Sequence, residues 1–232
     1  MGSDSRLVRG GRVKVARKTK AEAEQTRCSI LDAAEQLFYE QGVARTTLEE
    51  IAQTAGVTRG AIYWHFRDKD DLFEAMQARA ALPQEDVFDA LASDEGGDPL
   101  LGLREACKEA IRQTAADERR RRVYTILLLR CEYVGEMKAT EERRRRNAER
   151  MIGRLESIFA KAARNGTLSV VWSPKLAALT LHGLLVGLFV NWLEDPSKSD
   201  FATLGPDCVD ALFASLREPE ETRASKRSSS PT

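Results

Sequence analysis

The sequence has few of the residues from which catalytic and metal sites are usually built. It holds two histidines among 232 residues, and it contains no HExxH, no GxSxG and no phosphate-binding glycine loop. Its four cysteines lie far apart without a CxxC pair, which is typical of reduced thiols in a cytoplasmic protein rather than of a zinc site or a disulfide scaffold. These absences disfavour an enzyme and predict neither a cofactor nor a metal site. The cysteines are Cys28, Cys107, Cys131 and Cys208.

Net charge is also lacking, because 36 basic residues balance 36 acidic ones. A neutral total at first argues against a nucleic-acid-binding protein. The distribution of charge reverses that argument, because the segment before residue 21 is strongly basic and has Asp4 as its one acidic residue. Local positive charge, and not the total, is what attracts phosphate. These side chains are Arg6, Arg9, Arg12, Lys14, Arg17, Lys18 and Lys20.

A long uninterrupted hydrophobic run is missing as well. Residues 176–193 come nearest to a membrane span, but Thr180, His182, Asn191 and two glycines interrupt them. A buried helix is therefore the favoured interpretation. The N-terminus has no apolar stretch after its basic residues, so we expect neither a secretory signal nor contact with a membrane.

The sequence predicts an all-α fold, because helical periodicity recurs and no strand-like alternation of useful length occurs. A three-helix helix-turn-helix domain is expected at 15–67 and a larger helical domain at 68–216. Residues 1–14 are expected to be an unstructured arm or a leader segment, and 217–232 a disordered tail. Helices are expected at 22–41, 100–115, 118–133, 138–164, 174–193 and 201–216. Three shorter helices are expected between the first two of these, capped by Thr46 (with Glu49 as the capping-box partner), Thr58 and Asp68. Pro83 is expected to end or kink the third of them.

Residues 46–69, which read TTLEEIAQTAGVTRGAIYWHFRDK, are the most informative segment. An amphipathic helix is followed by a tight Gly56-Val57 turn, and a second short helix carries Arg59 and aromatic side chains opposite the apolar Ile62 and Phe66. This is a helix-turn-helix pattern. Ordinary surface helices expose Lys and Glu, so consecutive Tyr, Trp and His argue against a hairpin that only packs.

This segment resembles the DNA-binding domain of the tetracycline-repressor (TetR) family of bacterial regulators, and within it the branch that controls multidrug efflux. The likeness begins near Arg17, is strongest through Phe73, and continues more weakly through ILLLRCE at 126–132 to about Leu216. It implies a homodimeric repressor bound to double-stranded operator DNA. It also implies a C-terminal ligand-binding and dimerisation domain, in which a hydrophobic small-molecule effector releases the DNA.

The second helix of the motif is expected to enter the major groove of DNA, where base edges are distinguishable. Arg59 is the candidate for a base contact, because its planar guanidinium can meet guanine O6 and N7 together. Thr58 places a hydroxyl beside the backbone amides of a helix N-terminus, and Gly60 lets the backbone approach the duplex. The remaining expected contacts are to sugar and phosphate, from Tyr63, Trp64 and His65 by resemblance and from the flanking Thr47 and Lys69.

The resemblance also implies which residues line an effector cavity in the C-terminal domain. Leu128 and Val186 indicate an apolar wall, while Tyr124 and His182 would supply the few orienting hydrogen bonds. The expected ligand-binding residues are Tyr124, Leu128, His182, Leu185 and Phe189.

The helix at 174–193 lacks a polar face, so it is expected to face its own core and a second subunit, although a wholly internal helix is the alternative. Gly183 and Gly187 lie four residues apart and permit close backbone contact. Together with the helix at 201–216, it would form a four-helix interface between two copies. The expected interface residues are Leu179, Gly183, Gly187, Val190 and Leu212.

The preferred hypothesis is a repressor of an efflux operon, in which an effector displaces the helix that starts at Asp68 and moves the recognition helices out of register. One alternative is a thiol-based redox sensor that uses Cys131 or Cys107, and another is an architectural DNA-binding protein without an effector. The arginine runs at 119–122 and 143–146 resemble a second nucleic-acid site. Acidic neighbours at 118, 141 and 142 favour exposed ion pairs instead.

Overall fold

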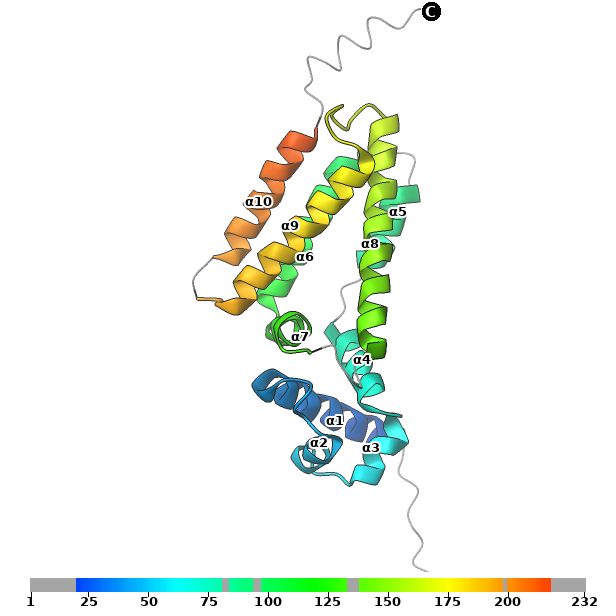
Figure 1. Cartoon of the computed structure of the whole chain (residues 1–232), viewed down its shortest axis with the longest axis vertical. Helices are drawn as coiled ribbons and strands as arrows, with labels where there is room; N and C mark the ends of the chain where they lie inside the picture. The colour runs from blue at the N-terminus through cyan, green and yellow to red at the C-terminus, as the bar shows by residue number, and fades with distance from the viewer. Residues whose placement is uncertain (1–19, 81–83, 94–96, 133–137, 198–199, 218–232) are drawn as a thin grey trace, which may run out of the picture.

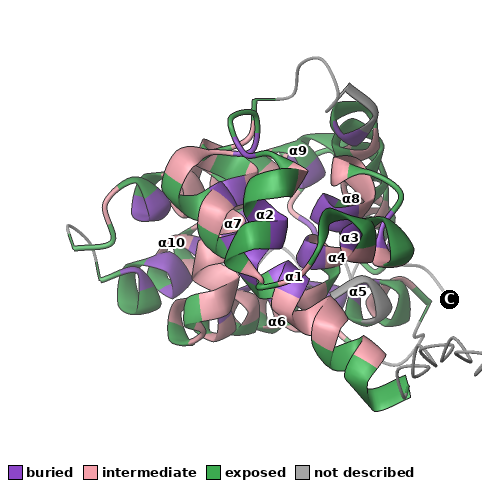
Figure 2. Ribbon diagram, turned by 90° about the horizontal axis from the view of Figure 1, so that it is seen from below, coloured by how far each residue is buried: buried purple, intermediate pink, exposed green. Residues whose placement is uncertain are grey.

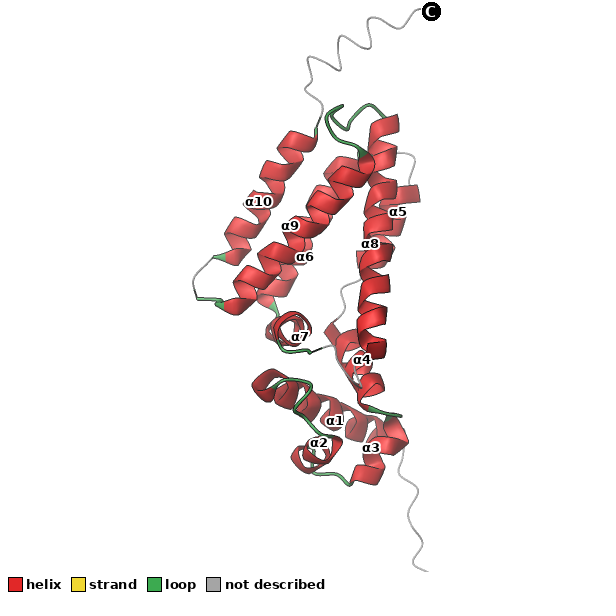
Figure 3. Cartoon of the chain, viewed as in Figure 1, coloured by secondary structure: helices red, strands yellow, loops and turns green. Residues whose placement is uncertain are grey.

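The computed structural model describes residues 20–80, 84–93, 97–132, 138–197 and 200–217. Throughout these residues the regular structure is helical, apart from one isolated antiparallel bridge between Leu168 and Arg217 (Figure 3). The all-α prediction is therefore confirmed. The helices are α1 (Lys20–Gln41), α2 (Leu48–Thr54), α3 (Arg59–His65), α4 (Lys69–Ala80), α5 (Gln84–Ser93), α6 (Pro99–Ala116), α7 (Glu118–Leu129), α8 (Lys138–Arg164), α9 (Pro174–Glu194) and α10 (Phe201–Leu216).

The helices form two bodies stacked end to end (Figure 1). Helices α1, α2 and α3 make a small head, and α5, α6, α8, α9 and α10 make a longer body. Helix α7 lies between the two and is seen end-on in Figure 1, and α4 leads from the head towards the start of α8.

Most helix boundaries match the prediction, and α8 and α10 begin and end where the sequence indicates. Two differences have local causes. Helix α7 stops at Leu129 instead of residue 133, where the carbonyl of Arg130 turns away to accept the N–H of Val43 at 3.0 Å. Helix α5 was not expected as a separate element; α4 ends at Ala80, before Pro83, which lies outside the described residues.

The predicted arm and nearly all of the predicted tail lie outside the described residues, and Lys20 is the first residue of the basic arm that the structure places. Arg217, assigned to the tail from the sequence, instead closes the long body. Its guanidinium donates to Asp98 Oδ2 at 2.6 Å, and its backbone pairs with Leu168.

The head has a hydrophobic core of its own. Phe38 of α1, Ile51 of α2 and Ile62 of α3 are fully buried in it. Helix α4 adds Phe73 and Met76, and the Phe73 ring meets Phe38 edge-on with 5.9 Å between centroids. The core of the head therefore includes side chains of α4, although the sequence places the end of the first domain at residue 67.

Helix α7 belongs to both bodies. Val123 and Ile126 are buried in the core of the head, whereas Tyr124 and Leu129 pack against the core of the long body. The helix contacts α1 and α4 on one side and α6 and α9 on the other. A change in the long body that moves α7 therefore also disturbs the packing of the head.

The end of α7 meets the end of α1 at a glycine. Gly42 stops α1 with φ +87°, a left-handed conformation that glycine adopts without strain. A Cβ there would also lie 3.3 Å from the carbonyl oxygen of Arg130. Glycine thus allows the close approach that the hydrogen bond between Val43 and Arg130 requires.

Helix α9 is the one helix in the described part of the chain that is long and apolar enough to cross a membrane, judged by length and composition alone. Only 28% of its most apolar window is buried within the chain. Ala177, Ala178 and Leu181 enter the core of the long body, while Leu176 and Leu179 are exposed. The helix is therefore not wholly internal, and its outer side is an apolar surface.

A carboxylate held by two cations ties α10 to α6. Asp210 accepts from Arg104 Nε at 2.7 Å and from Lys108 Nζ at 2.9 Å. These hydrogen bonds, that from Arg104 first, lower the pKa of Asp210 to about 2. A lowered pKa means that the stabilisation is present above the ordinary carboxyl pKa and is lost as the pH falls through the lowered one.

We expect Asp210→Asn to lower the free energy of unfolding by about 1 kcal/mol at neutral pH, discounted for the partial exposure of the pair. The loss should shrink as the pH falls from about 4 towards 2, because the wild-type carboxyl is protonated first in the unfolded chain and then, near its lowered pKa, in the folded protein. Urea denaturation at both ends of this range measures the difference. Glu105→Gln is the matched control, since Glu105 lies farther from the same cations, at 3.6 and 3.9 Å. An Asp210→Asn loss that is independent of pH would contradict the assignment.

Candidate DNA-binding site and ligand cavity

The turn into α2 is capped by Thr47, which corrects the expected cap at Thr46. Thr47 Oγ1 accepts the N–H of Glu50 at 3.2 Å, while Glu50 Oε2 accepts the N–H of Thr47 at 2.7 Å. This capping box lies one residue later than predicted, because the Thr46 side chain is buried and donates to the carbonyl of Gly42 at 2.8 Å. The backbone N–H of Thr47 is also the main cause of a lowered pKa at Glu50.

Helix α3 begins as the sequence predicts. Thr58 is its N-cap, and its Oγ1 accepts the N–H of Ala61 at 3.2 Å. Gly60 lies on the exposed side, where a Cβ would meet only Thr58 Oγ1, at 3.8 Å. A glycine costs about 1 kcal/mol in a helix relative to alanine. Since the fold leaves room for a side chain at residue 60, a glycine there fits the expected close approach of DNA.

The aromatic side chains of α3 point outward. Ile62 and Phe66 are buried, whereas Tyr63 is 48% and Trp64 73% exposed. The Trp64 ring meets the half-buried His65 edge-on, with 4.5 Å between centroids. Figure 2, which views the protein from the head end, shows α2 and α3 nearest the reader with exposed outer surfaces. Two large exposed rings on one short helix argue against a motif that only packs.

Arg59 lies along the outer face of α3. Its Nη2 donates to Tyr63 Oη at 3.1 Å, and its guanidinium lies 5.6 Å from the centre of the Tyr63 ring. This hydrogen bond is the main cause of the raised pKa of Arg59. Arginine is charged at all relevant pH values, so the pairing matters for position. It holds the guanidinium at the surface predicted to meet DNA.

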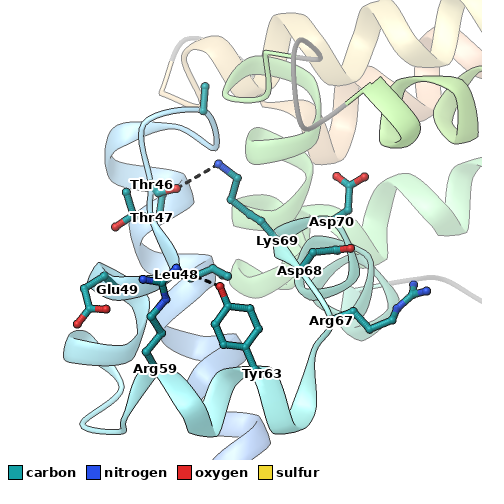
Figure 4. A pocket seen from close by; sticks show the side chains of 11 residues that line it. Thr46, Thr47, Leu48, Glu49, Arg59, Tyr63, Arg67, Asp68, Lys69 and Asp70 are labelled. Carbon is teal, nitrogen blue, oxygen red and sulfur yellow. Dashed lines mark hydrogen bonds between the residues drawn. The ribbon is translucent and has the colours of Figure 1, made fainter.

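An open groove of about 960 Å³ runs along this side of the head (Figure 4). It brings together Thr47, Arg59, Tyr63 and Lys69 from the predicted DNA contacts. Thr58, Gly60, Trp64 and His65 lie on α3 or at its start but do not line the groove. The full lining is Ala44, Thr46, Thr47, Leu48, Glu49, Arg59, Tyr63, Arg67, Asp68, Lys69 and Asp70.

Lys69 has a structural partner in addition to its predicted phosphate contact. Its Nζ donates to the carbonyls of Val43 and Thr46, both at 3.2 Å (Figure 4 shows the bond to Thr46). The ammonium thus fastens the start of α4 to the loop between α1 and α2, at the wall of the groove.

The long body contains a cavity of about 390 Å³ that reaches α4, α7, α8 and α9. All five predicted ligand positions line it: Tyr124 and Leu128 from α7, and His182, Leu185 and Phe189 from α9. The Tyr124 and Phe189 rings stack with 5.6 Å between centroids. The structure therefore gathers these residues around one cavity, although their binding of a ligand stays a prediction.

A second, inner cavity of about 110 Å³ shares Tyr124, His182, Leu185 and Phe189 with the first. Its other walls are almost entirely apolar, so the polar side chains gather at the mouth of the larger cavity and the inner cavity is apolar. The remaining lining of the inner cavity is Phe88, Cys107, Ala110, Met151 and Leu155.

Tyr124 and His182, which line both cavities, are favoured in their uncharged forms. Burial lowers the pKa of His182 and raises that of Tyr124. Burial also raises the pKa of Cys107 to about 12, so the thiolate that a redox sensor needs does not form there. Cys131, the other proposed sensor, is half-buried beside the core of the head. Burial therefore argues against Cys107 as the sensor.

Sequence analysis missed the α8 side of the cavity. Thr140, Arg143, Arg144 and Asn147 line the mouth, together with Gln77 of α4. The sequence interpretation placed the arginines on a solvated face, because their neighbours in sequence are acidic. Which face of α8 turns towards α7 and α9 depends on tertiary packing, for which one sequence carries no local signal.

The other arginine run joins the head to α7. Arg122 Nε donates to Glu35 Oε1 at 2.9 Å, and Arg119 Nη2 donates to Asp32 Oδ1 at 3.0 Å. Ion pairs therefore account for the run, as expected, but the main partners lie on α1 instead of on α7 itself. Glu35 is only 3% exposed, so separating its side chain from Arg119 and Arg122 would be costly.

The predicted dimer residues lie on the outer side of the long body. Leu179 and Gly183 are exposed, and Gly187, Val190 and Leu212 are half-buried. A Cβ at either glycine would meet no heavy atom within 4 Å, so nothing inside the chain requires a small residue at those positions.

An outward-facing helix-turn-helix head on a helical body with a cavity is the architecture of a DNA-binding regulator. Residues 30–76 match the family described as bacterial regulatory proteins, tetR family, and residues 98–217, more than half of the chain, match the C-terminal region of MAATS-type transcriptional repressors. This chain belongs to the TetR family of transcriptional regulators.

Similar proteins extend over most of the chain. The HTH-type transcriptional repressor BepR of Brucella suis is 40% identical over 88% of this chain and 97% of its own length. NalD, the secondary repressor of the MexAB-OprM multidrug efflux pump in Pseudomonas aeruginosa, is 40% identical over 86% of this chain and 99% of its own, with a TM-score of 0.78. SmeT in complex with triclosan is 32% identical over 84% of this chain and 92% of its own, with a TM-score of 0.74; SmeT represses the SmeDEF efflux pump of Stenotrophomonas maltophilia.

We expect Arg59→Ala to relax base preference, since a bidentate guanine contact contributes about 1–3 kcal/mol of discrimination. Competition between the preferred duplex and single-base variants measures this loss at each position. Because alanine favours a helix and Arg59 is exposed, the variant should keep the stability of the wild type. If discrimination is unchanged at every position, Arg59 does not contact a base.

We expect Lys69→Ala to weaken binding to all duplexes and to lower the slope of log affinity against log salt by about 1, the value for one lost phosphate contact. Titrations at several salt concentrations measure the slope. Weaker binding with an unchanged slope would show that Lys69 acts only through its bonds to the carbonyls of Val43 and Thr46.

Proposed function

We propose that this protein is a ligand-responsive transcriptional repressor of a multidrug efflux operon, released from a pseudo-palindromic operator by apolar small molecules. The observation that carries the proposal is the double role of α7. Tyr124 and Leu128 line the cavity, while Val123 and Ile126 of the same helix are buried in the head. Similarity to NalD and SmeT, both repressors of efflux pumps, supports the choice of operon.

The cavity suits a small apolar effector. The walls of the inner cavity are almost entirely apolar, and Tyr124 and His182 offer hydrogen-bonding groups within it. A ligand there would press on α7 and on α4, whose Gln77 also lines the cavity. Because α4 shares its core with α3, such a displacement would move the recognition helix. Repression is lifted only by as much as the effector prefers the non-binding state, typically 1–3 kcal/mol.

One helix-turn-helix covers only half of an operator, so the protein acts as a homodimer. Leu176, Leu179 and Gly183 recur with helical spacing along the exposed side of α9, and Leu204 of α10 is 52% exposed. A second copy is the occupant that would cover this apolar surface. The same surface, and not contact with a membrane, accounts for the apolar composition of α9. The protein binds DNA in the cytoplasm, and its role is binding rather than catalysis.

Selection of duplexes from a random pool with the full chain tests the proposal. We expect a consensus of two inverted half-sites about one helical turn apart, or a multiple of that distance. Adding the uncharged dye N-phenyl-1-naphthylamine should then lower the affinity for the selected duplex by about 5- to 150-fold. A pool without consensus would support an architectural DNA-binding protein, and a consensus without release would exclude a ligand-responsive repressor.

A further inference from the structure

The charged side chains that line the mouth of the cavity are both arginines. Arg143 and Arg144 of α8 both line it, and among the described residues that line the two cavities there is no Asp or Glu. The walls beyond the mouth are apolar and aromatic. Such a site offers guanidinium groups to a ligand with an apolar body and a negative group at one end.

Arg143 already holds a carboxylate, and that carboxylate is on α4. Arg143 Nη1 donates to Glu74 Oε2 at 2.8 Å. One turn away, Thr140 Oγ1 donates to Asp70 Oδ1 at 2.7 Å. Two side chains of the cavity mouth therefore fasten α8 to successive turns of the helix that connects the cavity to the head.

The bond between Arg143 and Glu74 is easy to exchange. The Arg143 side chain is 33% and the Glu74 side chain 49% exposed, and ion pairs at such positions contribute little to stability. An anion held in place by the apolar walls of the cavity would meet the same guanidinium with less exposure to water. A charge-assisted hydrogen bond is stronger under those conditions.

We propose that the cavity takes apolar acids, that is, molecules carrying a carboxylate, a sulfonate or an ionised phenol on an aromatic or aliphatic body, and that Arg143 recognises the acidic group by exchanging Glu74 for it. The inference rests on the proposed function and names its effector class. The exchange also detaches Glu74 from α8, so recognition of the acid is itself a step in the displacement of α4.

Two fluorescent probes with the same body test the charge preference. 1-Anilinonaphthalene-8-sulfonate carries a sulfonate that N-phenyl-1-naphthylamine lacks, and both brighten in an apolar site. We expect the sulfonate to bind the wild-type protein at least about tenfold more tightly, the difference that one charge-assisted hydrogen bond provides. Equal affinities, or tighter binding of the uncharged probe, would overturn the proposal.

Three variants identify the residue. Arg143→Gln should weaken binding of the sulfonate about tenfold and leave binding of the uncharged probe within about twofold, which also shows that the cavity has kept its shape. Arg146→Gln, the matched control, removes an arginine on the same helix that pairs with Glu142 and does not line the cavity, so it should change neither affinity. Glu74→Gln should tighten binding of the sulfonate alone, because it removes the competing carboxylate.

If Arg143→Gln and Arg146→Gln weaken binding of the sulfonate probe equally, Arg143 is not the recognition residue.

Release of the selected duplex separates this inference from the proposed function. If the uncharged probe binds and releases DNA while the sulfonate binds no better, only the preference for acids fails. If neither probe lowers the affinity for DNA at saturation, the ligand-responsive repressor fails as well. With Arg143→Gln, the uncharged probe should still release DNA, whereas the sulfonate should need about tenfold more.

Discussion

Helix α7 has to satisfy two hydrophobic cores at once, and the rest of the structure depends on that constraint. Neighbouring residues on one short helix point in opposite directions, Val123 into the head and Tyr124 into the body. Close-packed interiors have low compressibility and transmit strain, so a helix that packs in two cores shifts as a rigid unit. A cavity beside such a helix is coupled to the head through α7, although no described residue lines both the cavity and the groove of the head.

Around this apolar contact the two bodies are joined by charged groups. Asp32 and Glu35 of α1 face arginines of α7, and Glu74 of α4 faces Arg143 of α8. These ion pairs differ from a continuous hydrophobic interface. Where the charged groups are exposed, water or ions can replace either partner at a small cost in free energy. Glu35 is the exception, since its burial makes it costly to separate from Arg122. The ion pair between Glu35 of α1 and Arg122 is therefore costly to break, whereas the ion pair between Glu74 of α4 and Arg143 is easily replaced.

The sequence predicts best what is local. The turn at Gly56, the cap at Thr58 and the buried Ile62 of the motif follow from residues next to one another, and the structure confirms them. The cap of α2 was misplaced because two adjacent threonines have the same propensity, and only burial of Thr46 distinguishes them. The five cavity positions came from resemblance. The pair between Arg143 and Glu74 spans 69 residues, so no periodicity in the sequence reveals it.

The three tryptophans occupy three different environments. Trp64 lies exposed on α3, Trp172 donates its indole N–H to the carbonyl of Ser215, and Trp192 is buried with its ring stacked on Phe201 at 4.4 Å. Phe201 in turn meets Phe189 of the cavity wall at 5.2 Å. Trp64 thus lies in the head, and Trp192 is linked through the rings of Phe201 and Phe189 to the wall of the cavity. Intrinsic tryptophan fluorescence is therefore sensitive to changes at both ends of the molecule without any added label.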